Sequence, residues 1–439
     1  MNWLKKPLDL SVFKFYELGK HVLAVSDEMV KWIRIPQQTF SILKRLEGSS
    51  LKAVYVELGK LESADKPGIL ELLKFFGSGD IEKNFYNYEE KSVFFLVTQR
   101  CNLKCLTCYV NAEDRAAFEE MEIKEIEEIF RQLSSLGYAS ITLSGGEPLL
   151  HPNIKEIIEL SRKFFKTVNL NTNGILLDRN TAAFLKNQDV NIMVSLESFN
   201  PEINDSIRGS GVYSKVMQTL KYLKEAGHDK ITISMTLTNL NLSEVVKMHE
   251  FCVKEGFQEH YGVFVESGRG RCNSDYLKVN AGDQADTYFN LLRERAELEE
   301  ANLKVPDFLT KCATYCGAIK SIVNIMPNGD VYPCPNLIDP VWRMGNIRQT
   351  GLTDILDQSA VAKMIISRDV RGVAGCNSCR IRFICGGGCM ANAYISSGDI
   401  NNKDPLCELY NTVLSKQLEK WDVNKSHKEN IIDIMEVNK

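Results

Sequence analysis

The stretch SVFFLVT at residues 92–98, followed closely by CNLKCLTC at residues 101–108, decides the architecture of this chain of 439 residues. The apolar run predicts a buried strand, and the three cysteines after it have the spacing C-x3-C-x2-C. Three thiolates on one short loop can hold a [4Fe–4S] cube and leave its fourth iron open to a ligand from outside the protein. Zinc is the alternative interpretation, because zinc sites also use closely spaced cysteines.

A second motif, SGGEP at residues 144–148, follows the next predicted strand (140–143), which comes after a helix predicted over 124–136. Glycines allow the backbone to approach a ligand closely, and a glutamate carboxylate can receive an ammonium group. With the cysteine triplet, this order of motifs resembles that of the radical S-adenosylmethionine (SAM) enzymes. The resemblance implies that Cys101, Cys105 and Cys108 bind a cluster whose open iron is chelated by SAM. It also implies that the SAM amino group is bound by the loop of Gly145, Gly146 and Glu147.

One position departs from the pattern of these enzymes. The residue before the last cysteine is usually aromatic and packs near the adenine, whereas this chain has Thr107 there. We expect Tyr109, two residues further on, to supply the adenine contact instead.

Four more predicted strands each end in a polar cluster. The strands span 167–171, 191–195, 230–237 and 261–265, with helices predicted over 154–165, 181–186, 213–226 and 243–255. This alternation predicts an α/β fold, a partial (β/α)6 TIM barrel, with the polar clusters at the carboxyl ends of the strands where barrel enzymes place their sites.

The resemblance assigns further SAM contacts at these strand ends, namely Asn171, Asn173, Ser195 and Arg208, the last within the segment IRG at 207–209. An aspartate usually follows the serine in these enzymes, and Glu197 stands in its place. Polar residues at the strand ends are candidates to line the substrate site, without any being assigned as a base: Glu197, Asn239, Tyr261, Glu266 and Arg269.

The C-terminal cysteines resemble, position for position, the SPASM extension of radical SAM enzymes that mature peptides, an extension that holds two further [4Fe–4S] clusters. The resemblance assigns Cys316, Cys334 and Cys389 to a nearer auxiliary cluster, and Cys376, Cys379, Cys385 and Cys407 to a farther one. Cys312 is the candidate for the eighth thiolate, and without it the nearer cluster would have an open iron able to bind a substrate thiolate. Zinc is again the alternative.

Three other features concern the same region. Gly329, within PNGD at 327–330, is expected at the left-handed position of a hairpin that brings Cys316 and Cys334 together. Cys252 lies in a helical apolar pattern and is expected in the core, and Cys272 is expected to be free or near the substrate.

The first 85 residues contain no cysteine and no catalytic pattern. Strands are predicted over 13–18, 21–24 and 32–35, and helices over 37–46, 50–58 and 66–76. This order predicts a winged-helix-like module, and in front of such a barrel it resembles the RiPP recognition element. That element binds the leader of a ribosomally made precursor peptide as an added strand. A DNA-binding winged helix and a structural cap on the barrel are the alternatives.

Composition and charge agree with this organisation. The predicted domains are the module (1–85), the barrel (86–305), the SPASM domain (306–425) and a C-terminal tail (426–439). The net charge of −4 argues against nonspecific nucleic-acid binding. No signal peptide or membrane span is evident, so we expect a cytoplasmic protein. In a reducing compartment its 13 cysteines, an odd number, indicate metal ligands rather than disulfides, with Cys252 and Cys272 as the two exceptions.

The predicted function is that of a radical SAM maturase related to sactisynthases and cyclophane-forming enzymes. It would use a 5′-deoxyadenosyl radical to remove hydrogen from a precursor peptide and install a thioether or carbon–carbon cross-link. The implied cofactors are three [4Fe–4S] clusters and SAM, with flavodoxin or ferredoxin as the one-electron reductant. The alternatives are an enzyme like the anaerobic sulfatase maturases and a noncatalytic iron–sulfur electron carrier. A carrier would have no use for Gly146, Glu147, Asn171 or Arg208.

Overall fold

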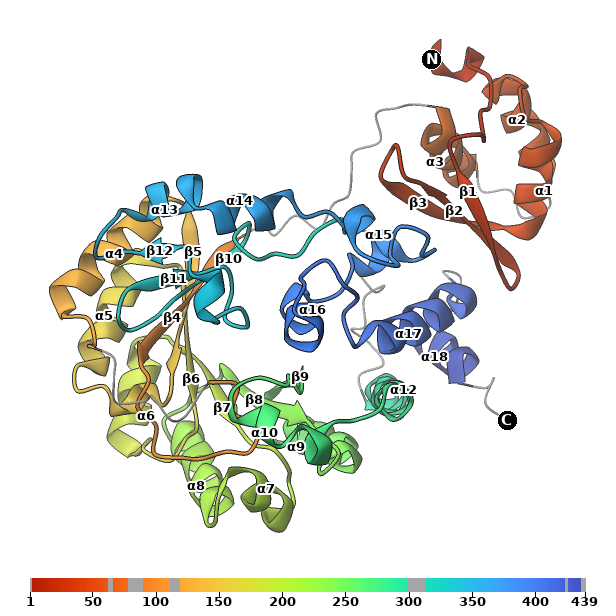
Figure 1. The fold of residues 1–439 in the computed structure, drawn as a ribbon. Coiled ribbons are helices and arrows are strands. Elements are labelled where there is room, and N and C mark those ends of the chain that lie inside the picture. The colour runs from red at the N-terminus through yellow and green to blue at the C-terminus, as the bar shows by residue number, and fades with distance from the viewer. Residues whose placement is uncertain are drawn as a thin grey trace.

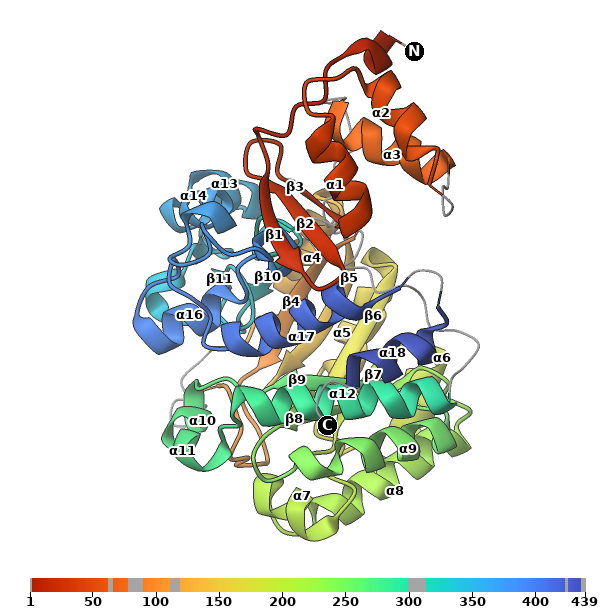
Figure 2. The same cartoon turned by 90° about the vertical axis from the view of Figure 1, so that its right-hand side faces the viewer.

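The computed structural model describes residues 2–61, 66–77, 90–110, 119–298, 313–422 and 425–435. Figures 1 and 2 show an N-terminal module, a barrel-like sheet with helices outside it, and a C-terminal cysteine-rich region beside both. Within these ranges no helix is both long and apolar enough to cross a membrane.

The N-terminal module has the order of elements predicted from the sequence. They are η1 (Asn2–Lys5), β1 (Lys14–Leu18), β2 (His21–Ser26), β3 (Lys31–Pro36), α1 (Gln37–Arg45), α2 (Leu51–Leu58) and α3 (Lys66–Gly77). The three strands form an antiparallel sheet in the order β1-β2-β3. The Ser50 hydroxyl accepts a hydrogen bond from the Ala53 N–H, so Ser50 caps α2 as expected for its position.

The central region alternates strands and helices. Its elements are β4 (Lys91–Thr98), α4 (Ile123–Ser135), β5 (Tyr138–Gly145), η2 (Pro148–Leu150), α5 (Ile154–Phe164), β6 (Thr167–Thr172), α6 (Arg179–Asn187), β7 (Asn191–Ser195), α7 (Pro201–Arg208), α8 (Val212–Glu225), β8 (Ile231–Leu237), η3 (Leu242–Glu244), α9 (Val245–Glu255), β9 (Gln258–Val263), α10 (Gly268–Cys272), α11 (Ser274–Leu277) and α12 (Ala281–Leu298). Strands β4 to β9 are parallel and adjacent in sequence order, which confirms the predicted six-stranded partial barrel.

The sixth strand differs from its prediction by a few residues. The sequence favoured 261–265, but the ladder with β8 runs from Gln258 to Val263. Phe264 is buried next to Gly270, so it packs under the following loop instead of extending the strand.

The C-terminal region contributes strands to the same sheet. Its elements are β10 (Ile322–Ile325), β11 (Asp330–Tyr332), η5 (Pro340–Trp342), β12 (Gly345–Asn346), α13 (Leu352–Gln358), α14 (Ala360–Ser367), η6 (Val370–Gly372), α15 (Arg382–Cys385), α16 (Met390–Ser397), α17 (Cys407–Lys420) and α18 (His427–Met435). The full sheet has the order β12-β11-β10-β4-β5-β6-β7-β8-β9, and β10 is parallel to β4. The hairpin with Gly329 at φ +89° therefore covers the edge that β4 would otherwise expose.

The end of the chain also differs from the prediction of a tail. Helix α18 packs against α12 and α17, where Ile434 and Trp421 are buried together with Phe289. The apolar residues of that helix explain why the segment folds back onto the protein.

Candidate active site and auxiliary cysteine sites

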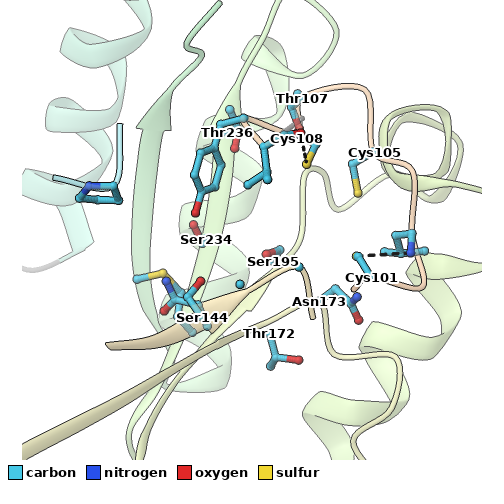
Figure 3. Close-up of a pocket in the computed structure, with 18 of the residues that line it drawn as sticks. Cys101, Cys105, Thr107, Cys108, Ser144, Thr172, Asn173, Ser195, Ser234 and Thr236 are labelled. Carbon is cyan, nitrogen blue, oxygen red and sulfur yellow. Dashed lines mark hydrogen bonds between the residues drawn. The ribbon is translucent and has the colours of Figure 1, made fainter. Parts of the chain in front are cut away.

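A cavity of about 310 Å³ lies at the carboxyl ends of the parallel strands. It is lined by residues that follow β4, β5 and β6, by the ends of β7 and β8, and by Pro335 and Asn336 from the C-terminal region. Figure 3 shows Cys101, Cys105 and Cys108 along one loop at one side of this cavity, with Ser144, Ser195, Ser234 and Thr236 across from them. The strand ends thus converge as the sequence predicted.

The Gly-Gly pair is required by the protein's own chain. A Cβ atom on Gly145 would lie 2.1 Å from the Thr98 carbonyl oxygen, and one on Gly146 would lie 2.1 Å from that of Arg100. The Gly146 N–H donates to the Thr98 carbonyl at 2.8 Å. The absence of side chains therefore lets the loop after β5 lie directly against the start of the cysteine loop.

Several contacts fix the cysteine loop from the other side. The Arg269 guanidinium donates to the Cys105 carbonyl at 3.1 Å, and the Leu106 N–H donates to the Ile207 carbonyl at 2.9 Å. The Asn173 amide donates to the Asn102 side chain at 2.7 Å. The loop that presents the three thiols is thus held by the residue after β6, by α7 and by the segment after β9.

Glu147, predicted to bind the SAM amino group, makes several hydrogen bonds within its own chain. Its side chain is fully buried and is not among the residues that line the cavity. The carboxylate accepts hydrogen bonds from the Thr172 hydroxyl (2.7 Å), the Asn173 N–H (2.7 Å) and the Leu149 N–H (3.1 Å). It therefore joins the loops after β5 and β6 through three donors, and Oε2, which accepts one of them, retains a lone pair for a further donor.

Arg208 and Glu197 form a buried ion pair on the cavity wall. The Arg208 Nη1 atom donates to Glu197 Oε1 at 3.0 Å, and Glu197 Oε2 accepts from the Thr236 N–H at 2.7 Å. Burial raises the pKa of Glu197, and the guanidinium opposes that rise. The Arg208 Nε atom is buried and has no hydrogen-bond partner within the described residues, so it can donate to an acceptor that enters the cavity.

The remaining predicted SAM contacts also lie in this cavity. Asn171, Asn173, Ser195 and Tyr109 line it, together with Thr107. Burial raises the pKa of Tyr109 to about 12, so its hydroxyl is neutral and its ring forms a partly apolar wall.

The substrate-site candidates are mostly elsewhere. Of the five, only Glu197 lines this cavity. Tyr261 donates its hydroxyl to Val245 and Glu259 on the outer side of β9, and Glu266 is paired with Lys278 at 2.7 Å. Asn239 is exposed, and Arg269 supports the cysteine loop as described above.

The sequence reasoning missed several lining residues. Ser234 and Thr236 of β8 face the cavity, while the residues between and before them, Met235 and Ile233, are buried on the other face. This alternation with a period of two was available in the sequence. Pro335 and Asn336 gave no such signal, because they reach the cavity only through the long-range pairing of β10 with β4.

The C-terminal cysteines form two groups. Burial raises the pKa of the Cys334 thiol to about 12, and Cys316 and Cys389 lie near enough to contribute to that rise. The other group lines a separate small cavity and consists of Cys376, Cys379, Cys385 and Cys407. The Asp404 carboxylate lines this second cavity and accepts the Cys389 N–H at 2.6 Å, so it contacts both groups. Cys312 lies outside the described residues.

The other cysteines agree with their expected places. Cys252 is buried in the barrel core. Cys272 is exposed and lines a cavity next to Tyr109, outside both cysteine groups.

The thiols lie in two separate places that fit clusters. Cys101, Cys105 and Cys108 line the main cavity, and Cys376, Cys379, Cys385 and Cys407 line the second one. Three or four thiolates around one cavity are the ligands that an iron–sulfur cube uses.

Comparison with known proteins identifies both parts of this arrangement. Residues 95–252 match the radical SAM superfamily, and residues 316–380 match the iron–sulfur cluster-binding domain called SPASM. These two segments contain the cysteine loop of the main cavity and four of the C-terminal cysteines, Cys316, Cys334, Cys376 and Cys379.

Individual relatives cover most of the chain. The mycofactocin maturase MftC of Mycolicibacterium smegmatis is 27% identical over 320 residues, which are 71% of this chain and 81% of that protein. The antilisterial bacteriocin subtilosin biosynthesis protein AlbA of Bacillus subtilis is 29% identical over 301 residues, 67% of this chain and 66% of that protein. The crystal structure of Streptococcus suis SuiB bound to precursor peptide SuiA has the same fold, with a TM-score of 0.58 and 17% identity. It covers 90% of this chain and 98% of that one.

Proposed function

We propose that this chain, a radical SAM enzyme with an iron–sulfur cluster-binding SPASM domain, installs a cross-link in a ribosomally synthesised precursor peptide. The observation that carries the proposal is the cavity at the strand ends, which three thiols of one loop share with Ser195 and Arg208. A peptide substrate is supported by three relatives, which are a maturase, a bacteriocin biosynthesis protein and a protein crystallised with a precursor peptide.

The residues of the main cavity would have separate roles in binding the cluster and SAM. When bound, the reduced cluster and SAM supply a 5′-deoxyadenosyl radical that removes a hydrogen atom from the substrate. We assign Cys101, Cys105 and Cys108 to the cluster. The unpaired Nε of Arg208 would donate to an acceptor on SAM, and Glu197 orients that guanidinium. The protein's contribution is positioning and the exclusion of water.

The other SAM assignments follow from the cavity wall. Asn171, Asn173 and Ser195 would bind the polar groups of SAM, and Tyr109 would contact the adenine. Gly145 and Gly146 would act through their backbone, and Glu147 would act indirectly by fixing Asn173.

The two C-terminal cysteine groups would hold the auxiliary clusters. We assign Cys316, Cys334 and Cys389 to the nearer one, with Cys312 as its fourth thiolate. The farther one would be bound by Cys376, Cys379, Cys385 and Cys407, which surround one cavity. Thiolate ligands need a reducing compartment, so we place the protein in the cytoplasm with flavodoxin or ferredoxin as electron donor.

The N-terminal module would bind the leader of the precursor peptide. Its sheet has two edges, β1 and β3, to which a peptide strand could add. The Glu17 carbonyl of β1 already accepts a hydrogen bond from Arg380 at 3.5 Å, so we favour the β3 edge. Main-chain hydrogen bonds there would supply affinity, and the core of the peptide would then reach the barrel.

For the bond that the enzyme forms in the peptide, we favour a thioether or a carbon–carbon bond between side chains. Each cross-link removes two hydrogen atoms from the peptide: one would be abstracted by the radical to give 5′-deoxyadenosine, and the other would leave as a proton while its electron passes to an auxiliary cluster. An enzyme that resembles the anaerobic sulfatase maturases is the second candidate, because it would share the barrel and the auxiliary clusters but need no leader-binding module.

A reconstitution experiment tests the proposal. Protein reconstituted with iron and sulfide under anaerobic conditions would be given SAM, dithionite and a synthetic peptide encoded beside its gene. We expect 5′-deoxyadenosine and a product lighter by two hydrogen atoms per cross-link, and little product from the same core peptide without its leader. Modification of a sulfatase-derived peptide instead would favour the second candidate. No 5′-deoxyadenosine with any substrate would contradict both.

A further inference from the structure

The sheet of the N-terminal module is buried on both faces. Val22 and Ala24 of β2 join the module's own helices in one apolar core. Leu23 and Val25, which alternate with them along the strand, join a second core formed with the cysteine-rich region. Figures 1 and 2 show the strands next to α15 and α17. The module is therefore docked on the rest of the protein by a continuous apolar face.

This second core surrounds the farther group of cysteines. It contains Cys376, with Cys379 and Cys385 packed at its margin, and the buried side chains of Phe383 and Leu418. Three of the four cysteines that line the farther cavity thus belong to the same apolar cluster as residues of the module's sheet. The module contributes to the packing around that site.

A buried guanidinium links the module to the loop that carries these cysteines. Arg382 begins α15, between Cys379 and Cys385, and only 1% of the residue is exposed. Its Nε donates to Asp27 Oδ1 at 2.8 Å, and Asp27 lies in the turn between β2 and β3 of the module. Its Nη1 donates to the Cys379 carbonyl at 2.6 Å. One side chain therefore contacts the module and the cysteine loop at the same time.

We propose that Asp27 is a positioning residue for the farther auxiliary cluster. It pairs with Arg382, and Arg382 in turn fixes the loop from Cys379 to Cys385 around the cluster. A buried charge without a partner is strongly unfavourable, so loss of the carboxylate would displace Arg382 and the carbonyl that it holds. This inference rests on the proposed function in one respect, namely that these cysteines bind a cluster.

The other partners of Asp27 cannot replace this role. Lys14 also pairs with the carboxylate, at 3.0 Å, but 59% of the lysine side chain is exposed, so water compensates for its loss. Arg371 donates to the Asp27 carbonyl at 3.2 Å, a contact that a change of the side chain leaves in place. The pairing with Arg382 differs because the Arg382 side chain is 0% exposed, whereas 36% of the Asp27 side chain is exposed in both pairs.

The test compares Asp27→Asn with a matched control, Lys14→Ala, which removes the exposed partner of the same carboxylate. Each full-length protein would be reconstituted with iron and sulfide, and its iron content, its paramagnetic resonance spectrum and the midpoint potential of the farther cluster would be measured. We expect Asp27→Asn to lose up to about four irons per chain, or to retain them with a shifted spectrum and potential. Lys14→Ala and the conservative Asp27→Glu should resemble the unchanged protein.

The remaining outcomes separate the possible failures. Iron content, spectrum and potential of Asp27→Asn identical to those of the unchanged protein would overturn the proposal. Cys379→Ala, examined in parallel, identifies the signal of the farther cluster. If that variant loses no iron and no signal, the cysteine assignment itself is wrong and the role of Asp27 falls with it. SAM binding by calorimetry should be unchanged in Asp27→Asn, and its loss would show general misfolding, against a specific positioning role.

Discussion

Removal of the Arg208 guanidinium should have two separable effects, one on SAM and one on the fold. Arg208 lines the cavity; its buried Nε atom has no hydrogen-bond partner in the described part of the chain, while Nη1 pairs with Glu197 at 3.0 Å. The variant Arg208→Ala removes the proposed SAM contact and at the same time leaves the Glu197 carboxylate buried without its cation. A variant that removes both charges, Arg208→Met with Glu197→Gln, separates the two effects.

The expected magnitudes differ enough to be distinguished. A charge-assisted hydrogen bond to SAM is worth roughly 1.5–3 kcal/mol, so SAM binding should weaken at least about tenfold. Removing one partner of a buried ion pair costs about 3–5 kcal/mol. Arg208 and Glu197 side chains are only 7% and 3% exposed, so water compensates little for the loss.

Calorimetry and hydrogen exchange provide the two measurements. The Thr236 N–H donates to Glu197 at 2.7 Å and reports on that carboxylate directly. In Arg208→Ala the hydrogen exchange of the Thr236 amide should accelerate, with an upper limit between roughly a hundredfold and a few thousandfold. The SAM affinity of the cluster-loaded protein should fall. In the double variant the exchange should slow again, while SAM affinity stays low. Unchanged SAM affinity in Arg208→Ala would refute the assignment, and unchanged exchange would refute the argument from the ion pair.

Three further predictions concern separate parts of the chain. Reconstituted protein should contain about twelve irons, and replacing Cys101, Cys105 and Cys108 together by alanine should remove about four of them and all SAM cleavage; stoichiometric zinc in place of iron would contradict this in an elemental assay. Glu147→Gln places an amide N–H against one of three donors, so the folded state should lose about 1–3 kcal/mol of stability and SAM binding should weaken because Asn173 is displaced. A SAM affinity by calorimetry equal to that of the unchanged protein would argue against this prediction. Burial lowers the pKa of Lys31 to about 8 from 10.5, so between these pH values the unfolded chain binds more protons and the contribution of Lys31 to stability rises with pH. Thermal unfolding measured from pH 8 to 10.5 should show a smaller rise in stability for Lys31→Met than for the unchanged protein. Equal slopes of stability against pH in the two proteins would exclude the effect.

The barrel could be predicted from the sequence because its signals are local. Apolar runs such as that of β4 and β5 mark parallel strands covered on both faces. The spacing of the cysteines then located the main site, and the left-handed Gly329 located the hairpin between β10 and β11. In each case the information lies within a few residues of the feature.

The missed details depend on contacts between distant segments. β10 pairs with β4 across more than two hundred residues, as the hydrogen bond from Ser92 to Ser321 shows, and no local pattern specifies that partner. The hydrogen bonds of Glu147 are a detail of the same kind, because its carboxylate accepts from the Thr172 hydroxyl and the Asn173 N–H at the end of the next strand.

In the N-terminal module, the sequence of β2 indicates a buried strand but not the residues that bury it. Strand β2 contains the unbroken apolar run VLAV at residues 22–25, and all four residues are buried. In an antiparallel sheet with one solvent-exposed face, apolar and polar residues should alternate along a strand, so this run indicates that both faces are covered. The residues that cover the second face could not be identified from the sequence, because Leu418 and Phe383 lie far along the chain.

Deleting residues 1–85 would expose the core formed with these residues and leave Arg382 without Asp27. Loss of activity in a truncated protein would therefore not by itself demonstrate leader binding. A proline placed in β3, an edge strand of the module's sheet, blocks strand addition and keeps the docked face intact. This change tests the module's role in peptide recognition.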